Sequence, residues 1–422
     1  MNYIDKLLLL AFPFMDVGFM IFGIPFRLGE LAFLLFFLRL LDINAISKIT
    51  KINKSGFLIL FVLLLNLILT VSVAFFSTID EGFYYKYVVR NTLYIFAFMS
   101  FVIKPINYEQ IKFESFIRYI LYVVSIFYVI EFIDYYIVSF NWSDSIFVSR
   151  QEKHIFNDIM IRFAGPSSEP AYVVPLLAIP LMYGFIKRKL KYSLWSMVFI
   201  LLTFSSFGYL VLVFSVLYFL NGSADKALKR KVKNGLFYAA TTMAVVGLIF
   251  FKKVSIMIAY NWEKFQAYFG IGDVYEWSAA QRLGHMKLGA NLFLESSWLR
   301  MIFGNGTGYY NKMSKSFTEF FLDDAEEAHN LYLSTLTDRG LIGLLLIIIL
   351  FNIISNIKIP KTAPAEYKGF FIAIKFGVYV RMAHWFFTGM LWQYYFWVEV
   401  ALLISASAYF IKMSNERRGD RF

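Results

Sequence analysis

Apolar segments about as long as a membrane is thick recur along the whole chain, and they constrain its fold more than any other feature. An α-helix needs about 20 apolar residues to cross about 30 Å of hydrocarbon. Hydrophobic residues make up 59% of the sequence and charged residues only 17%, which is more apolar surface than a soluble domain buries. We therefore expect an all-α, polytopic integral membrane protein with a single transmembrane domain over residues 1–422.

The stretch 192–221 decides the number of spans, because it is long for one helix and short for two. Lysine and arginine residues precede it at 187–191 and follow it at 226–233. Short basic loops stay in the cytoplasm, so the stretch is predicted to form a hairpin of two short helices with an outer turn at 205–208. The chain then has about 12 spans. The others are expected at about 7–24, 27–41, 56–76, 88–103, 115–139, 169–186, 235–251, 331–356, 369–390 and 392–411.

The distribution of lysine and arginine also predicts the orientation. Both termini fall on the cytoplasmic side of a bacterial inner membrane, and the apolar run after Met1–Lys6 is a first anchor rather than a cleaved signal. Periplasmic loops are expected at about 77–87, 140–168 and 252–330, the last being the main external subdomain. The net charge of +12 follows the cytoplasmic loops, so we expect membrane lipids and no nucleic acid as partners.

A polar segment closes the second external loop and opens a helix: Arg162-Phe163-Ala164-Gly165-Pro166-Ser167-Ser168-Glu169-Pro170. Proline favours the first helical turn, which makes Glu169 or the serine before it the N-cap, where the helix dipole stabilises a carboxylate. Two interpretations stay open. Glu169 is only a cap and Arg162 a surface cation, or both belong to a site.

The largest external loop carries Arg282 and a glycine-rich segment, Gly304-Asn305-Gly306-Thr307-Gly308. Such glycines can cradle a phosphate, but neither a strand nor a phosphate-binding lysine accompanies them, so a tight turn is the simpler interpretation. Arg282 alone is no more than a solvated cation. It gains meaning only in combination with the other candidates.

His329 and Asn330 lead directly into the apolar run 331–356. Four acidic residues at 323–327 precede the histidine, and their summed field is expected to raise its pKa and favour proton transfer near neutral pH. The competing interpretation is a histidine that packs at a helix start. His154, His285 and His384 show no metal-ligand spacing with His329, so no metal site is expected.

Three further basic residues fall inside or close to spans. Arg90 follows a tyrosine-rich segment, and its side chain can reach the outer surface, although a role in substrate binding stays open. Arg381 and His384 are one helical turn apart and therefore share a face. An arginine in hydrocarbon costs about 2.5–3.5 kcal/mol and needs an anionic partner or water, so we interpret these two as a structural pair in the bundle.

Taken together, these residues resemble those of bacterial O-antigen polymerases and O-antigen ligases, which are membrane glycosyltransferases of the GT-C architecture. The resemblance lies in the order Arg162-x-x-Gly165-x-x-x-Glu169-Pro170, the short hairpin around 203–208, Arg282, the glycine-rich turn and His329-Asn330. Many members carry Ser-Arg-Gly at the hairpin turn, where this chain has Ser206-Phe207-Gly208. The helix start at Glu169-Pro170 is closer to the Wzy-type polymerases.

The resemblance implies a polymerase that transfers a growing undecaprenyl-diphosphate-linked glycan onto a sugar hydroxyl of a new lipid-linked repeat unit, with inversion. Guanidinium groups match the oxygens of a departing diphosphate, a role assigned to Arg162 and Arg282, with Arg90 as a further candidate and Asn330 for the glycan. His329 is the first candidate for the base that deprotonates the hydroxyl, and Glu169 is the second. No cofactor or metal is implied, while a chain-length regulator is a possible protein partner.

Other functions stay open at this stage. A ligase differs from a polymerase only in its acceptor, the lipopolysaccharide core. A flippase for lipid-linked oligosaccharides is expected to carry charges through its spans and an internal repeat, whereas here the polar groups gather in external loops and no repeat is evident. A peptidoglycan polymerase requires an external aspartate, and Asp273, Asp323 and Asp324 are available for it.

Overall fold

The computed structural model describes residues 3–15, 17–21, 24–29, 54–74, 81–138, 155–156, 160–167, 169–222, 277–314, 328–359, 363–388 and 394–417, with a few positions between 259 and 266. These residues are mostly helical, as predicted. The helices are α1 (Tyr3–Ala11), α4 (Lys54–Ala74), α5 (Glu81–Ile103), α6 (Phe113–Ile133), α7 (Pro170–Ile186), α8 (Leu190–Leu202), α9 (Ser206–Gly222), α12 (Trp277–Leu294), α13 (Trp298–Phe303), α14 (Tyr309–Ser314), α15 (Leu331–Ser355), α16 (Ala365–His384) and α17 (Tyr394–Arg417).

Two short antiparallel strand pairs depart from the all-α prediction. Strand β1 (Gly18–Ile21) pairs with β2 (Ile24–Arg27), and β3 (Ile155–Phe156) pairs with β4 (Met160–Ile161). The predicted span at 7–24 is therefore wrong, because α1 ends at Ala11 and β1 begins seven residues later. Pro13 lies in the 3₁₀ turn that follows α1, where it offers no amide to the i→i−4 hydrogen bonds of a continuing α-helix.

Most other predicted spans coincide with helices. Three of the described helices are long and apolar enough to cross a membrane, namely Lys54–Ala74, Phe113–Ile137 and Leu331–Ser355. Shorter apolar helices occupy Tyr87–Ile103, Pro170–Ile186, Leu190–Leu202, Ser206–Phe219 and Tyr395–Ile411. The two short helices of the predicted hairpin are present as α8 and α9, but they are joined at 203–205 rather than at 205–208, because α9 begins at Ser206. The predicted span 235–251 lies outside the described residues, and so does the predicted span 27–41 from residue 30 onward.

Helix α4 shows the outward face expected of a membrane helix. Phe57, Phe61, Leu64 and Ile68 follow one another at helical spacing and are between 45% and 59% exposed. A soluble protein rarely leaves so many large apolar side chains on one face in water. These side chains instead fit contact with lipid, and the chain is consistent with a membrane protein.

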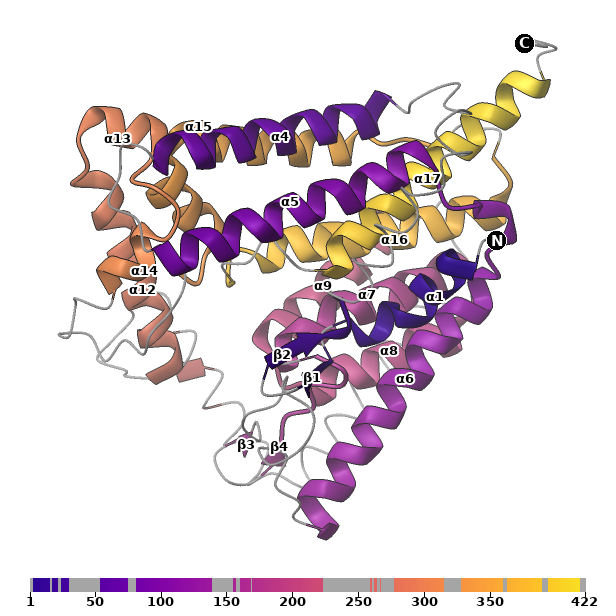
Figure 1. Ribbon diagram of the computed structural model, residues 1–422. Helices are drawn as coiled ribbons and strands as arrows, with labels where there is room; N and C mark the ends of the chain where they lie inside the picture. The colour runs from indigo at the N-terminus through magenta and orange to yellow at the C-terminus, as the bar shows by residue number, and fades with distance from the viewer. Residues whose placement is uncertain are drawn as a thin grey trace.

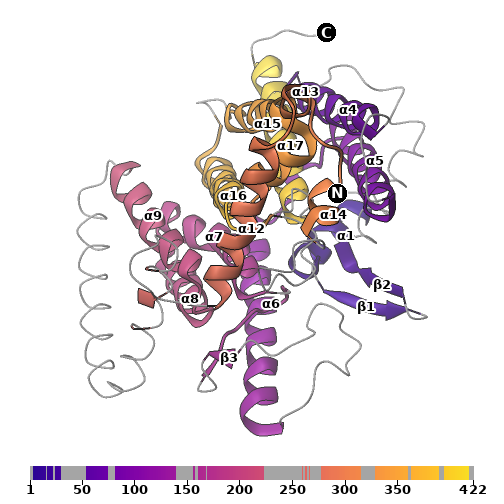
Figure 2. The same cartoon turned by 90° about the vertical axis from the view of Figure 1, so that its left-hand side faces the viewer.

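The helices form two groups that meet along α7 and α16 (Figure 1). Helices α4, α5, α15, α16 and α17 make up one group, while α7 packs against α6, α8 and α9 in the other. Helices α12, α13 and α14 lie at the left end of Figure 1, and the start of α1 and the end of α17 lie at the right. The view in Figure 2 shows the same separation of α8 and α9 from α4 and α5.

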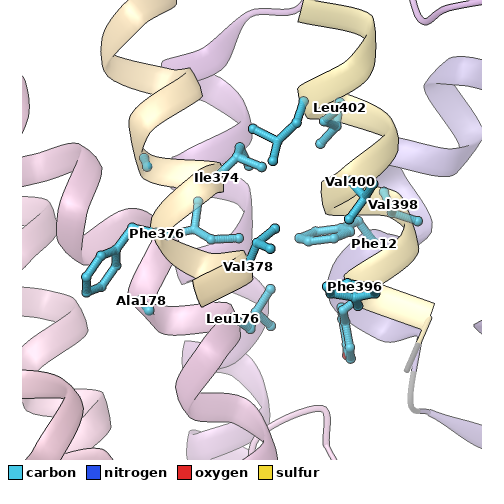
Figure 3. Packing of buried hydrophobic residues seen from close by; sticks show 14 of the residues in the cluster. Phe12, Leu176, Ala178, Ile374, Phe376, Val378, Phe396, Val398, Val400 and Leu402 are labelled. Atoms are coloured by element: carbon cyan, nitrogen blue, oxygen red, sulfur yellow. The ribbon is translucent and has the colours of Figure 1, made fainter. Parts of the chain in front are cut away.

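The contact between α7 and α16 is tightly packed (Figure 3). Leu176 and Ala178 of α7 and Val378 of α16 have no exposed surface. A Cβ added at Gly377 would come within 2.6 Å of Ile179, so only glycine permits this approach. The two prolines inside α7 are also buried in this packing, which favours close packing over a cavity wall as the reason for their presence.

Candidate functional site

His329 lies at a junction between two helix ends. Asn330 is the N-cap of α15, because its Oδ1 accepts hydrogen bonds from the amides of Tyr332 (3.0 Å) and Leu333 (3.1 Å). Its Nδ2 donates to the Phe386 carbonyl at 3.1 Å, just beyond the end of α16. The Asn330 amide thus fixes the backbone next to His329, while its expected role in binding the glycan stays a prediction.

Further hydrogen bonds join the same two helix ends. The Leu331 amide donates to the carbonyls of Trp385 and Thr388, both at 3.0 Å, and the Tyr332 hydroxyl donates to the Met382 carbonyl at 3.2 Å. His329 itself has a φ of 49°, in the left-handed region that is unfavourable for a side chain with a Cβ. Backbone strain of this kind persists only where the surroundings impose it, and it gathers at functional sites.

A second histidine lies against His329. The ring of His285 on α12 meets that of His329 edge to face, with centroids 4.9 Å apart. His285 Nδ1 shares a hydrogen bond of 2.7 Å with the hydroxyl of Tyr310 on α14. Burial raises the pKa of Tyr310, so its hydroxyl stays protonated. Helices α12 and α14 thus hold an imidazole beside His329.

The expected rise in the pKa of His329 is wrong. Burial, followed by the charges of His285 and Arg282, lowers the pKa of His329 to about 4. The acidic residues at 323–327 on which the expectation rested lie outside the described residues. Burial first, and then the neighbours in space, therefore keep this imidazole neutral at pH 7.

Arg282 lies on α12, one turn before His285, so the two side chains share a helix face. Its charge acts on His329 and also on His384 at the end of α16. Arg282 is half-buried. The guanidinium of Arg282 thus acts on two histidines that lie 55 residues apart in the sequence.

His384 does not pair with Arg381 as the sequence suggested. Arg381 instead forms a buried ion pair with Glu399 of α17, with an N–O distance of 2.9 Å. Its guanidinium also lies 4.8 Å from the ring centroid of Tyr395. The sequence argument was correct that a buried arginine needs an anionic partner, but the partner comes from the next helix. His384 is left to face a different group of residues.

The hairpin turn and the start of α7 both reach His384. Its ring lies 4.6 Å from that of Phe207 and 5.2 Å from that of Tyr172, measured between centroids. Phe207 lies in the first turn of α9, directly after the hairpin turn, and Tyr172 follows the N-cap Glu169 by three residues. The position that holds arginine in many ligases thus carries a buried aromatic ring that packs on a histidine.

Arg162 lies beside the same hairpin turn. Its Nε donates to the Thr203 carbonyl at 3.4 Å, and the next residue, Phe163, donates its amide to the Leu202 carbonyl at 3.1 Å. Glu169 is half-buried at the N-cap of α7, as predicted, although its side chain makes no capping hydrogen bond. The predicted residues Arg162 and Glu169 are therefore both near elements that contact His384.

The loop after Arg162 is held by a carboxylate that sequence reasoning missed. Glu131 of α6 is 4% exposed, and its two oxygens accept the amides of Ala164 (3.1 Å) and Gly165 (3.2 Å). Gly165 has a φ of 63°, which few residues other than glycine adopt. An acidic residue in an otherwise apolar span is the signal that could have found Glu131.

The amides in and after the glycine-rich loop bind an anion, and this anion is a carboxylate of the same chain, that of Asp338. The carboxylate of Asp338 on α15 accepts the amides of Gly308 (3.1 Å) and Tyr310 (3.2 Å). The amides of Asn305 and Gly306 donate to the carbonyls of Thr337 and Asp338, at 3.1 and 2.9 Å. Three amides of the loop and one from the start of α14 thus bind one turn of α15.

Arg339 of α15, which sequence reasoning missed, faces α4 and α5, and the predicted residue Arg90 lies on α5. Arg339 is buried and donates to Asn66 Oδ1 at 2.8 Å and to Thr335 Oγ1 at 3.1 Å. Its guanidinium lies 5.4 Å from the ring centroid of Tyr87, one turn before the half-buried Arg90. Helices α4, α5 and α15 meet at Arg339. Arg90 is thus placed by α5, away from the hairpin turn that holds Arg162.

The arrangement combines cations with a neutral imidazole. Arg282 supplies paired N–H donors of the kind that bind phosphate oxygens, and neutral His329 can accept a proton. No group of three histidine or acidic side chains suited to a metal ion occurs among the described residues. The site therefore has the chemistry needed to deprotonate a hydroxyl beside an anionic leaving group.

One comparison with known proteins bears on this site. Residues 174–348 match the family model described as O-antigen ligase. This part of the chain is similar to O-antigen ligases. The match contains Arg282, His329 and the glycine-rich loop, and it supports the O-antigen ligase and polymerase family and a role in the biosynthesis of lipopolysaccharide or another polysaccharide. No curated protein matches the chain.

Proposed function

We propose that this chain is an O-antigen or related surface-polysaccharide polymerase. In this proposal it acts at the periplasmic face of the bacterial inner membrane and transfers a growing undecaprenyl-diphosphate-linked glycan to a new lipid-linked repeat unit. The observation that carries the proposal is the cluster of Arg282, His285 and His329, in which a guanidinium from α12 acts on an imidazole at the start of α15. The family match over the same segment supports it.

The reaction follows from the groups in the cluster. A sugar hydroxyl of the incoming unit attacks the anomeric carbon of the donor, and its proton passes to His329. The bond between that carbon and the diphosphate oxygen breaks with inversion, and the diphosphate leaves on its lipid. Arg282 stabilises the negative charge that develops on the phosphate oxygens, with Arg162 as the second cation. No metal ion is required for this charge stabilisation.

The donor also makes His329 a better base. Arg282 lowers the pKa of free His329, as does burial. When a diphosphate binds the guanidinium, its negative charge offsets that effect, and the pKa of His329 rises. The imidazole therefore gains basicity only when the leaving group is in place. Glu169, half-buried at the start of α7, remains the second candidate for the base.

A ligase is the second candidate function, and the description of the matching family favours it. In that case the acceptor is the lipopolysaccharide core, and the chemistry at the anomeric carbon is the same. The hairpin turn supports the polymerase instead. Phe207 occupies the position where many ligases carry arginine, and its ring packs on His384, so that cation is missing from this site.

Deletion of the gene separates the two functions by the products that remain. Without a polymerase, single repeat units still reach the lipopolysaccharide core, and electrophoresis of the lipopolysaccharide shows core plus one unit. Without a ligase, long polymer accumulates on undecaprenyl diphosphate and the core stays bare. We expect the first result. A bare core with abundant lipid-linked polymer would contradict the polymerase and support the ligase.

A further inference from the structure

His384 is a buried titratable residue that the reaction outlined above does not use. Its side chain is 1% exposed, at the end of α16. Its Nδ1 has no hydrogen-bond partner among the described residues. A buried polar atom without a partner is uncommon in native proteins, because it loses its hydrogen bonds to water on burial. The described residues therefore leave the hydrogen-bonding capacity of His384 Nδ1 unused.

The surroundings of His384 belong to the candidate site. Four hydrogen bonds join the end of α16 to the start of α15, which carries His329. Arg282 acts electrostatically on both histidines. Tyr172 and Phe207 contact the His384 ring from the start of α7 and from the hairpin turn. Elements from four parts of the sequence therefore meet at this imidazole.

The chemistry of this location matches a sugar better than a phosphate. Guanidinium groups already provide for the diphosphate, and an imidazole packed among aromatic rings is a poor additional anion site. A sugar hydroxyl both donates and accepts hydrogen bonds, so it can pair with the imidazole in either tautomer. The rings of Tyr172 and Phe207 add the apolar, rigid surface typical of small-molecule sites.

We propose that His384 is a substrate-binding residue whose imidazole hydrogen bonds a sugar hydroxyl of the lipid-linked glycan beside the reacting carbon. This inference rests on the proposed glycosyl transfer. His384 orients the sugar, while His329 accepts the proton and Arg282 binds the diphosphate. Neither the family match, which ends at residue 348, nor the sequence motifs include His384.

The test uses the full-length chain purified into lipid nanodiscs, with lipid-linked repeat units extracted from a strain that lacks the gene. H384F keeps an aromatic ring beside Tyr172 and Phe207 but removes both nitrogens, and H384N keeps a polar group near Nδ1. The control is W385F. Trp385 is the next residue, its Nε1 is also buried without a partner among the described residues, and its ring packs instead against Phe351 and Phe396.

Loss of one hydrogen bond to the substrate is expected to raise KM for the lipid-linked unit about 10-fold in H384F, with kcat changed by less than about twofold. H384N should recover most of this loss, and W385F should match the wild type. Wild-type kinetics in H384F, or equal losses in H384F and W385F, would overturn the role of His384 alone. If H384F does not fold, H384A replaces it in the test, and a wild-type KM in well-folded H384A would overturn that role. Absence of any glycosyl transfer by the wild type would overturn the proposed function itself.

Discussion

The backbone of His329 adopts a left-handed conformation. The next residue, Asn330, is the N-cap of α15, and α12 packs against this helix. That conformation costs about 1–2 kcal/mol for a residue with a Cβ. The cost makes sense if the position of the imidazole matters more than local stability. At the scale of single residues, the Asn330 cap and the ring of His285 fix the position of the His329 imidazole.

The pH dependence of transfer is expected to report the unusual state of His329. Its pKa is lowered to about 4, so the imidazole is neutral, and able to act as a base, at every pH well above that value. The acid limb of kcat/KM should therefore lie near pH 4–5 and not near 6.5. The acid limb of kcat should lie at a higher pH, because a bound diphosphate offsets the lowering of the His329 pKa by Arg282. Steady-state kinetics of the purified chain between pH 4 and 8 provide the measurement, and a kcat/KM limb at 6.5 would contradict this account.

The sequence identifies several site residues but not their states. The order of Arg162, Arg282 and His329 follows from motifs, and the structure brings Arg282 and His329 together as that order suggests. The sign of the pKa shift of His329 does not follow, because acidic neighbours in the sequence say nothing about its burial, the largest cause, or about the charges of His285 and Arg282. His384 was assigned to the wrong partner for the same reason.

Helix α15 carries His329 at its start, and its helical geometry is interrupted at Gly340. Gly340 has φ 65° and ψ −165°, a combination that is almost exclusive to glycine. The break frees the carbonyls of Thr337 and Asp338, and the glycine-rich loop donates its amides to them. Irregular backbone at membrane depth is tolerated only where such partners are present. The loop and the break therefore require each other.

Gly340→Ala is expected to disrupt this element. The left-handed backbone alone costs about 1–3 kcal/mol with a Cβ present. The added Cβ would also lie 2.6 Å from the amide nitrogen of Gly304 and closer still to the Ile302 carbonyl. We expect lower thermal stability in detergent and loss of transfer. Gly289→Ala is the matched control, because its Cβ finds its nearest neighbour at 3.1 Å, in a side chain. Equal stability of Gly340→Ala and the control would show that the break does not require glycine.

Glu131→Gln tests whether α6 positions the Arg162 loop. Both carboxylate oxygens accept loop amides, and glutamine can supply only one acceptor, so its amide group faces a backbone N–H. An unsatisfied buried donor costs about 1–3 kcal/mol. We expect a lower melting temperature and reduced transfer, whereas Ile126→Val, on an exposed face of α6, should change neither. Full activity in Glu131→Gln would mean that the loop does not need this anchor.

The elements were predictable to different degrees. Apolar length and basic flanks were enough to find the α8–α9 hairpin. They failed for 7–24, where a proline and strand pairing override hydropathy. The glycine-rich segment was correctly interpreted as a turn, but the partner of its amides could not be predicted, because Asp338 lies about 30 residues farther along the chain. Long-range hydrogen bonds leave no local signal in the sequence.

At the scale of the molecule, the described helices of the large loop lie at one end of the bundle, and the start of α1 and the end of α17 lie at the other (Figure 1). This arrangement agrees with the orientation predicted from basic residues, which remains a prediction. The chain has no cysteine, so single cysteines report sidedness directly. In intact cells, Lys315→Cys should react with an impermeant maleimide and Arg230→Cys should not. The reverse pattern would invert the topology.

The central claim is that Arg282 and His329 form one transferase site in which a guanidinium stabilises the leaving diphosphate and an imidazole accepts the proton. Transfer by the purified chain with lipid-linked repeat units, in the presence of EDTA, tests it most directly. We expect wild-type activity to persist in EDTA. Arg282→Lys and His329→Ala should each lower kcat/KM about 10²–10³-fold at equal folding, since an ammonium keeps the charge but loses the paired geometry. Near-normal transfer by both variants would contradict the claim and show that the reaction occurs elsewhere in the molecule.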